Sequence, residues 1–251
     1  PATGALVLIA GASAPGAVAA NQIISAADIA FLRYTPPANA NGAAYANFTF
    51  QLRDDGGTAN GGVNLDPVAN TMTIDVVSVN DAPSGADITL STNEDTALSF
   101  TAANFGFSDA SDSPANTLQG VRITALPAAG TLTLIAGASA PGAVTANQII
   151  SAADIPFLRY NPPLNANGAG LENFTFRVID DGGTANGGIN EDASANTVTI
   201  DVTSVNDAPA GTNNTVTTLE DTNYVFTAAD FGFTDPSDAP ANALQSVIIA
   251  T

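Results

Sequence analysis

The sequence contains no cysteine, no histidine and no tryptophan, and its five basic residues are all arginine, so lysine is absent as well. Without cysteine, disulfides and thiolate metal sites are impossible. Catalytic triads built on histidine or cysteine are excluded, and a zinc site is disfavoured. The absence of lysine removes Schiff-base and P-loop chemistry. Of the common catalytic arrangements, only a pair of carboxylates, as in a glycosidase, remains.

Positive charge is scarce, and negative charge is not. The chain has 24 acidic residues, which gives a net charge of −19. This charge argues against nucleic acid or an anionic membrane as a partner, and it fits a multivalent cation or a very salty medium. Twenty of the acids are aspartate, the short carboxylate of turns and of calcium loops. No apolar run approaches the roughly 18 residues of a membrane span.

The chain repeats itself with a period of 126 residues. At that offset 87 of 125 aligned pairs are identical, without a gap, and "SVNDAP" occurs at Ser78–Pro83 and again at Ser204–Pro209. The chain is therefore part of a tandem array that starts and stops within a repeat. A catalytic carboxylate pair would have to recur in every copy, which suits a spacer better than an enzyme. We expect no enzymatic activity.

Within each copy the hydrophobic pattern is that of β-strands. Residues alternate between apolar and polar in "NFTFRVID" (Asn173–Asp180) and "NTVTIDVTSV" (Asn196–Val205), and glycine and proline clusters separate shorter segments of the same kind. A short helical turn is expected at Ser151–Ile155, where Ser151 can cap it. Many short strands in a unit of this size predict an all-β, two-sheet sandwich.

The repeated "VNDAP" marks the end of each copy. Proline cannot donate a hydrogen bond to a sheet, so the last strand must end before it, and the residues preceding proline are held extended. We therefore expect a short, stiff connector between sandwiches. The predicted boundaries are 1–83 for the last two-thirds of one copy, 84–209 for a complete copy, and 210–251 for the first third of the next.

The strand that ends in "VNDAP" resembles the cadherin-type linker, whose fuller pattern is Asp-x-Asn-Asp-Asn-x-Pro. The stretch "GTLTL…ISAADIPFLRYNPP…NFTFRVIDDGG" is similar to chondroitin-sulfate-proteoglycan-type and bacterial cadherin-like repeats. This resemblance implies tandem Ig/cadherin-like β-sandwiches joined end to end in a large, secreted cell-surface adhesin. It also implies calcium ions at the junctions.

The resemblance implies calcium ligands from the linkers, from acids early in a copy and from an acidic pair late in a copy. Acids that crowd one end of a sandwich would repel one another unless a cation lay between them. "DDGG" can equally be an Asx-type turn, and the "DASD" and "DPSD" loops can equally be solvated. The candidates are Asn80, Asp81, Asn206 and Asp207 (linkers); Glu94, Asp95, Glu220 and Asp221 (early acids); Asp54, Asp55, Asp180 and Asp181 (late pairs); and Asp109, Asp112, Asp235 and Asp238 (loops).

The linker departs from the family pattern. Ser78 and Ser204 stand where its first aspartate is expected, and its second asparagine is missing. Fewer linker oxygens favour one or two calcium ions at each junction over three.

Two functions fit these observations. The first is a calcium-rigidified stalk or spacer of an extracellular adhesin or cell-surface filament. The alternative is a module that itself binds glycan or a partner protein. Sugar platforms need tryptophan or tyrosine, and the sequence has four tyrosines, two of them in copies of "LRY" where alternation predicts burial. This favours the stalk.

The incomplete copies at the two ends leave two further alternatives. The sequence can be a window cut from a longer continuous array. Separate chains can also join head to tail, each tail completing the next head by strand complementation. In either case we expect a neighbour at both ends.

Overall fold

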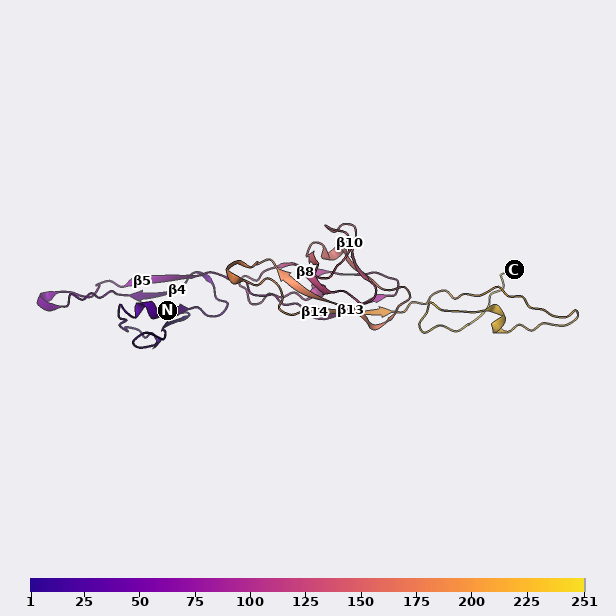
Figure 1. The fold of residues 1–251 in the computed structure, drawn as a ribbon, viewed down its shortest axis with the longest axis horizontal. Coiled ribbons are helices and arrows are strands. Elements are labelled where there is room, and N and C mark those ends of the chain that lie inside the picture. Colours follow the sequence, from indigo (N-terminus) through magenta and orange to yellow (C-terminus); the bar gives the residue numbers. More distant parts are fainter. Residues whose placement is uncertain (251) are drawn as a thin grey trace. The chain divides into compact units, whose positions relative to one another are not determined.

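The computed structural model describes residues 1–250, and it consists of β-strands joined by turns (Figure 1). Helical structure in these residues is limited to short 3-10 turns of three or four residues. None of their helices has the length and hydrophobicity needed to cross a membrane. The chain divides into two compact units. Unit 1 comprises Pro1–Asp81, Ala110–Asn116 and Gly182–Ile189, and unit 2 comprises Ala82–Asp109, Thr117–Asp181 and the chain from Asn190 onward.

Unit 1 contains two small antiparallel sheets. Their strand orders are β2-β1-β3 and β4-β5. The elements are β1 (Ala5–Leu8), β2 (Gly16–Ala17), η1 (Ile29–Phe31), β3 (Leu32–Thr35), β4 (Gly42–Phe50), η2 (Ala59–Gly61), β5 (Asn70–Val76) and η5 (Ala185–Gly187).

Unit 2 contains two larger sheets. One has four strands in the order β10-β9-β12-β7, and the other has five in the order β11-β8-β13-β14-β6. The elements are β6 (Ile88–Asn93), β7 (Leu98–Ser99), η3 (Ala102–Phe105), β8 (Leu118–Ala125), β9 (Thr131–Leu134), β10 (Gly142–Ala143), β11 (Ile149–Ser151), η4 (Ile155–Phe157), β12 (Leu158–Asn161), β13 (Gly168–Asp180), β14 (Asn196–Thr203) and η6 (Ala228–Phe231).

Both larger sheets contribute to one hydrophobic core. Phe174 and Phe176 of β13 and Val198 and Ile200 of β14 are fully buried, which confirms the inward face predicted from alternation. Tyr160 of β12, in the four-stranded sheet, is buried in the same core. The all-β class is confirmed, and all the buried residues of this core come from the central copy, residues 84–209.

A buried aspartate organises the turn before β12. The Asp154 carboxylate accepts hydrogen bonds from the Ser139 amide (2.8 Å), the Ser139 hydroxyl and the Ser151 hydroxyl (2.9 Å). The Asp154 amide in turn donates to Ser151 Oγ at 3.2 Å, within a non-helical turn. The expected helical turn over Ser151–Ile155 with Ser151 as its cap was wrong in position, because the N-cap of the 3-10 residues is Asp154 and no side chain caps them. The helical residues begin at Ile155, directly after Asp154. Asp28 makes the equivalent bonds in unit 1.

Replacing Asp154 with asparagine is expected to make the thermal stability of the chain depend less on pH in the acid range. The hydrogen bonds from Ser139, and then the one from Ser151, lower the pKa of Asp154 in the folded state. Its stabilising effect is therefore complete above the ordinary pKa and is lost as the pH falls through the lowered one. Melting midpoints measured between about pH 5 and pH 2 should fall less in Asp154→Asn than in the wild type. Ser139→Ala should reproduce part of this change, and an unaltered profile in both variants would contradict it.

Candidate metal centre

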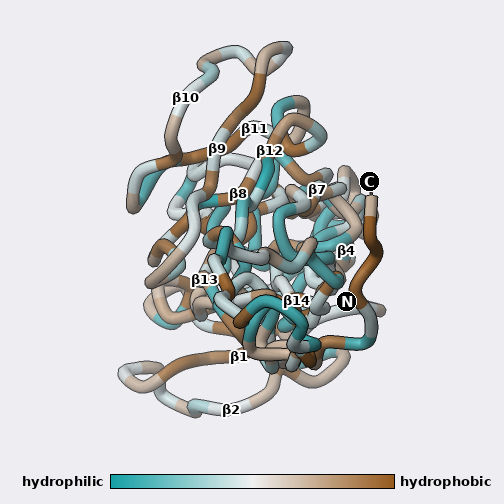
Figure 2. Tube along the Cα trace, turned by 90° about the vertical axis from the view of Figure 1, so that its right-hand side faces the viewer, coloured by the Kyte–Doolittle hydropathy of each residue, from teal (hydrophilic) through white to brown (hydrophobic). Residues whose placement is uncertain are grey.

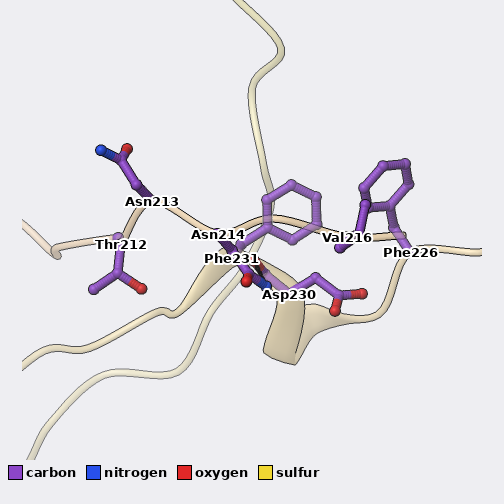
Figure 3. Close-up of a pocket in the computed structure, with 8 residues that line it drawn as sticks. Thr212, Asn213, Asn214, Val216, Phe226, Asp230 and Phe231 are labelled. Carbon is purple, nitrogen blue, oxygen red and sulfur yellow. Dashed lines mark hydrogen bonds between the residues drawn. The ribbon is translucent and has the colours of Figure 1, made fainter. Parts of the chain in front are cut away.

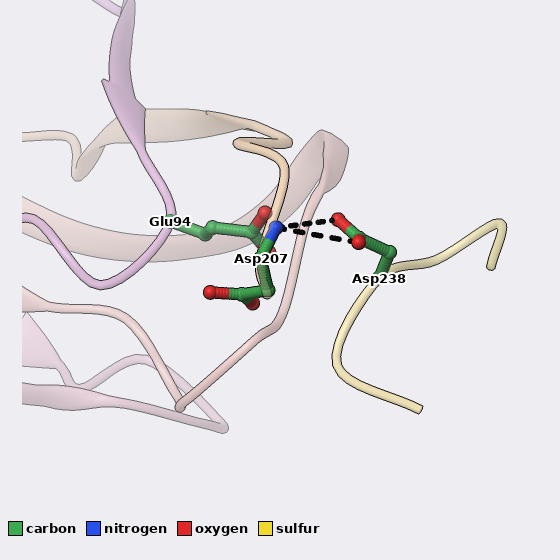
Figure 4. Close-up of side chains that lie close together, drawn as sticks. All are labelled: Glu94, Asp207 and Asp238. Carbon is green, nitrogen blue, oxygen red and sulfur yellow. Dashed lines mark hydrogen bonds between the residues drawn. The ribbon is translucent and has the colours of Figure 1, made fainter. Parts of the chain in front are cut away.

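Three carboxylates of unit 2 meet at the end of the central copy (Figure 4). Glu94, Asp207 and Asp238 each offer one oxygen, and these oxygens all lie within 4.8 Å of one another. Glu94 and Asp238 are buried, and Asp207 is half-buried. Two ligands of one calcium ion can be at most about 5 Å apart, because each bond is about 2.3–2.6 Å long. The three oxygens are therefore close enough to hold one metal ion.

The parallel pairing of β6 and β14 brings two of these acids together. In parallel strands the carboxyl ends lie at the same edge of the sheet. Glu94 directly follows β6, and its amide donates to Thr203 O at the end of β14 (2.9 Å). Val205 was expected to be the last residue of that strand, but β14 ends at Thr203. The Val205 amide instead donates to Glu94 Oε1 (2.5 Å). This hydrogen bond holds the start of the linker, two residues before Asp207, next to the glutamate.

The third acid, Asp238, comes from the loop "DPSDAPAN" of the C-terminal copy. The Asp207 amide donates to both Asp238 oxygens, at 3.2 and 3.3 Å (Figure 4). Asn242 closes the loop, because its amide donates to Asp235 Oδ2 (2.7 Å) and its side chain donates to Asp238 Oδ2 (3.0 Å) and Asn206 Oδ1 (2.8 Å). The linker and this loop thus form one hydrogen-bonded joint.

The acids of this joint repel one another. Burial raises the pKa of Asp207, and the negative charges of Asp238, Asp95, Glu94 and Asp235, in that order, raise it further. The pKa of Glu94 is lowered, because its carboxylate accepts hydrogen bonds from the Val205 amide and the Asn167 side chain. Glu94 is therefore held ionised, while ionising Asp207 is costly in the absence of a cation.

Two oxygens at the joint are buried without a hydrogen-bond partner, Asp207 Oδ2 and Asp235 Oδ1. Burying an ionised carboxylate oxygen is unfavourable unless a hydrogen bond or a cation compensates it. Every side chain in the cluster offers oxygen, the ligand atom of hard divalent cations such as calcium, magnesium and manganese. The residues present fit such an ion.

The first linker repeats half of this joint, within unit 1. The Asp81 amide donates to Asp112 Oδ2 (3.0 Å), as Asp207 does to Asp238, and the Asn116 side chain donates to Asn80 Oδ1. Asn80 also pairs with the "ANGGI" loop: its side chain donates to Ile189 O (2.7 Å), and the Ile189 amide donates to Asn80 O (2.9 Å). Among residues 1–250, three acids are found together at the second linker alone.

The remaining candidates lie elsewhere. Asp180 ends β13 and Asp181 follows it. Because β13 is antiparallel to β14, both lie at the opposite end of the five-stranded sheet from Glu94. Asp181 accepts hydrogen bonds from the Thr117 amide (2.7 Å) and hydroxyl (2.6 Å). Asp54 Oδ1 accepts from the Gly56 amide (2.9 Å), which is the Asx-type turn. Asp109 is buried, whereas Asp55, Glu220 and Asp221 are exposed.

Sequence reasoning missed two residues that matter at the ends of the fold. Asn242 ties the metal-centre loop together, and the only signal for it is the repetition of "PAN" in the two copies of that loop. Asp192 is buried and accepts from the Gly85 amide (2.7 Å) and the Asn196 side chain (2.7 Å). The "D-x-S" spacing to Ser194, whose amide also bonds to Asp192, was the local signal for this turn.

No protein-family model, no curated protein and no solved structure matches this chain.

Proposed function

We propose that this chain is a stretch of a calcium-rigidified stalk or spacer, built from Ig/cadherin-like sandwiches, in an extracellular adhesin or cell-surface filament. One observation carries the proposal. The triad takes Glu94 from the start of the central copy, Asp207 from the linker and Asp238 from the next copy. An ion bound by all three would tie a copy, its linker and its successor together, which is what a stiff array requires.

Calcium fits this joint better than magnesium does. Calcium takes six to eight oxygen ligands in flexible geometry, often several carboxylates, whereas magnesium keeps much of its water. Asp95 and Asp235 lie close enough to raise the pKa of Asp207. Two further carboxylates are therefore near the triad and could add oxygen ligands for a calcium ion. Glu94, Asp207 and Asp238 would hold the ion, and the ion would supply the positive charge that their repulsion calls for.

The fold also supports a structural role. Tyr160, one of the two "LRY" tyrosines, is fully buried and so cannot serve as a sugar platform. The linker residues Asn80 and Asn206 both receive a hydrogen bond from an asparagine of the loop that follows, so this part of the joint recurs at both linkers. A repeated joint of fixed construction is expected of a spacer.

We expect calcium to raise the melting midpoint of the chain. A ligand present at 100 times its dissociation constant stabilises the folded state by about 2.7 kcal/mol per site. The measurement is thermal unfolding in excess EDTA, in millimolar calcium and in millimolar magnesium at equal ionic strength. Calcium should give the highest midpoint. Coincident midpoints in EDTA and calcium, or an equal rise with magnesium, would contradict the assignment of calcium to this joint.

A further inference from the structure

The first linker is held by a loop that lies far along the chain. This loop, residues 182–189, contains the turn η5, and it belongs to unit 1 together with the linker residue Asn80. The Asn80 side chain donates to Ile189 O (2.7 Å), 109 positions away, and the Ile189 amide donates to Asn80 O (2.9 Å). The Asn116 side chain donates to Asn80 Oδ1. Both polar atoms of the Asn80 side chain and its carbonyl oxygen are therefore bonded to the protein.

Two glycines of the loop make room for this asparagine. A side chain at Gly182 would overlap Asn80 Oδ1 and Asn116 Nδ2, and a Cβ at Gly188 would lie 3.0 Å from the Asn80 Cβ. Gly188 has an ordinary extended backbone (φ −61°, ψ 157°), and Gly182 is also outside the left-handed region. Backbone conformation does not require glycine at either position, so the close approach of Asn80 does.

The other two glycines of the loop shape the turn. Gly183 (φ +76°) and Gly187 (φ +86°) lie in the left-handed region, and a side chain at either would meet no atom within 4 Å. The four glycines of "GGTANGG" thus divide into two that form the turn and two that receive the asparagine.

The turn takes its shape from its own sequence. The same letters recur at residues 56–62, where Asn60 has φ 56° and ψ 31° against φ 56° and ψ 23° for Asn186. There, side chains at Gly56 and Gly62 would meet only atoms of residues 54–59. The loop therefore adopts this conformation with or without an asparagine against it.

Hydrophobic contact does not account for the position of the linker on the loop. Val79 and Ile189, the apolar side chains nearest to the hydrogen bonds in sequence, are 45% and 56% exposed. Apolar residues gather in strands such as β1, which is brown in Figure 2, whereas the loop before Ile189 consists of glycine, threonine, alanine and asparagine. Hydrogen bonds and shape therefore hold the linker in place.

Asp181 and Thr117 stand next to the residues that contact Asn80. The Thr117 amide (2.7 Å) and hydroxyl (2.6 Å) donate to the Asp181 carboxylate, and the Asp181 amide donates to Thr117 O (3.0 Å). Thr117 directly follows Asn116, and Asp181 directly precedes Gly182. These bonds keep the donor to Asn80 Oδ1 and the glycine that accommodates it at a fixed spacing.

The groove in the C-terminal copy is of a different kind (Figure 3). Val216 and Phe231 are among the residues that line this open space of about 370 Å³. The carboxylate in its lining, Asp230, accepts hydrogen bonds from the Thr227 amide (2.7 Å) and the Tyr224 hydroxyl (3.2 Å). Its charge is thus engaged by residues of the same copy, whereas the loop at the first linker bonds a segment distant in sequence.

We propose that Asn116 and the loop 182–189 form a receptor for a linker asparagine, and that Asn80 is a positioning residue which fixes the linker without a metal ion. The ligand is a primary amide on an extended backbone. Its oxygen requires a donor, its nitrogen an acceptor and its carbonyl a second donor, and the receptor supplies all three. This assigns Asn80 to a polar receptor instead of the calcium-ligand role that the family resemblance implies.

Hydrogen exchange at the Ile189 amide measures whether the receptor is occupied, because this amide bonds to the linker carbonyl (2.9 Å). The Gly188 amide bonds to Ala185 O (3.0 Å) and reports on the loop alone. In excess EDTA the wild type should protect both amides, and added millimolar calcium should leave the protection of Ile189 unchanged. An Ile189 amide that is unprotected in EDTA, or protected only when calcium is added, would overturn the proposal.

Asn80→Asp separates the receptor role from the ligand role. Calcium sites accept aspartate in place of asparagine, whereas the receptor would then have a carboxylate oxygen facing Ile189 O where Nδ2 donates now. The protection of Ile189 should fall roughly tenfold or more in EDTA and in calcium alike, since a donor is lost and two acceptors face each other. Gly188 should keep its protection. Wild-type protection of Ile189 in this variant, or its loss at both amides, would count against a preformed receptor.

Gly182→Ala tests the fit from the side of the receptor. Its backbone tolerates alanine, but the methyl group needs the space of Asn80 Oδ1, so the protection of Ile189 should again fall roughly tenfold. Thr184→Ala is the matched control in the same loop, because the Thr184 side chain is exposed and does not cap the turn. It should behave like the wild type. Equal protection of Ile189 in the two variants would refute the fit.

The receptor and the calcium joint can fail separately. The receptor is tested in EDTA at the first linker, whereas the acidic triad lies at the second. A negative exchange result therefore leaves the calcium proposal standing. Coincident melting midpoints in EDTA and calcium would likewise leave the receptor standing.

Discussion

Replacing Phe176 with alanine is expected to lower the free energy of unfolding of the central copy by about 3–5 kcal/mol. Phe176 is fully buried in the middle of the five-stranded sheet, and its ring meets Phe105 edge-on at 4.9 Å. The substitution removes apolar contact area and leaves a cavity, because strands paired on both sides cannot move in to fill it.

The repeat provides a matched control for this prediction. Phe50→Ala makes the same chemical change at the same position of the N-terminal copy, where the ring is only half-buried. The loss of unfolding free energy caused by Phe50→Ala should be markedly smaller than the loss caused by Phe176→Ala. Denaturant unfolding followed by the signal of Tyr160, which lies in the same core as Phe176, reports on the central copy. A loss below about 1 kcal/mol for Phe176→Ala, typical of surface changes rather than cavities, would show that the core is not as described.

The strands themselves could be read from the sequence. Alternation identified β13 and β14 and their inward residues, because one face of each strand is buried and the side-chain period of a strand is two. The partners of these strands could not be read in the same way. That β6 lies parallel to β14 is a long-range pairing, and no local pattern in "ITLSTN" specifies it.

This pairing decides which acids meet. Glu94 and Asp207 are 113 positions apart, and they come together because β6 and β14 run in the same direction. Asp181 was an equally plausible ligand from its sequence context, but it follows a strand of the opposite direction. Composition and turn motifs therefore predicted the kind of site, whereas strand direction selected its members.

Burial of an acid was equally hard to foresee. Asp154 and Asp192 are more buried than several candidate ligands, yet hydrogen bonds within the protein account for both. Their spacing to serine or asparagine is local and was visible in the sequence. Asp207 differs, because its buried oxygen lacks a partner, and only the three-dimensional arrangement shows that.

Asp207→Asn is expected to have opposite effects with and without calcium. Without calcium, burial and the neighbouring acids raise the pKa of Asp207, so its ionised form destabilises the joint. The wild-type joint should therefore lose stability as the pH rises through this raised pKa, and the neutral asparagine should remove that loss. With calcium the missing charge is a missing ligand, and calcium affinity should fall roughly tenfold or more, in line with the dependence of such sites on ligand charge.

Hydrogen exchange at the amides of Asp207 and Asn242, which bond to Asp238 and Asp235, measures the joint directly. In EDTA at neutral pH, Asp207→Asn should protect these amides more than the wild type does, and in millimolar calcium it should protect them less. Asp55→Asn makes the same change of net charge at an exposed residue of the other compact unit and should alter neither condition. If Asp207→Asn shifts protection in the same direction in both media, the carboxylate does not serve a cation, and the joint is held by its hydrogen bonds alone.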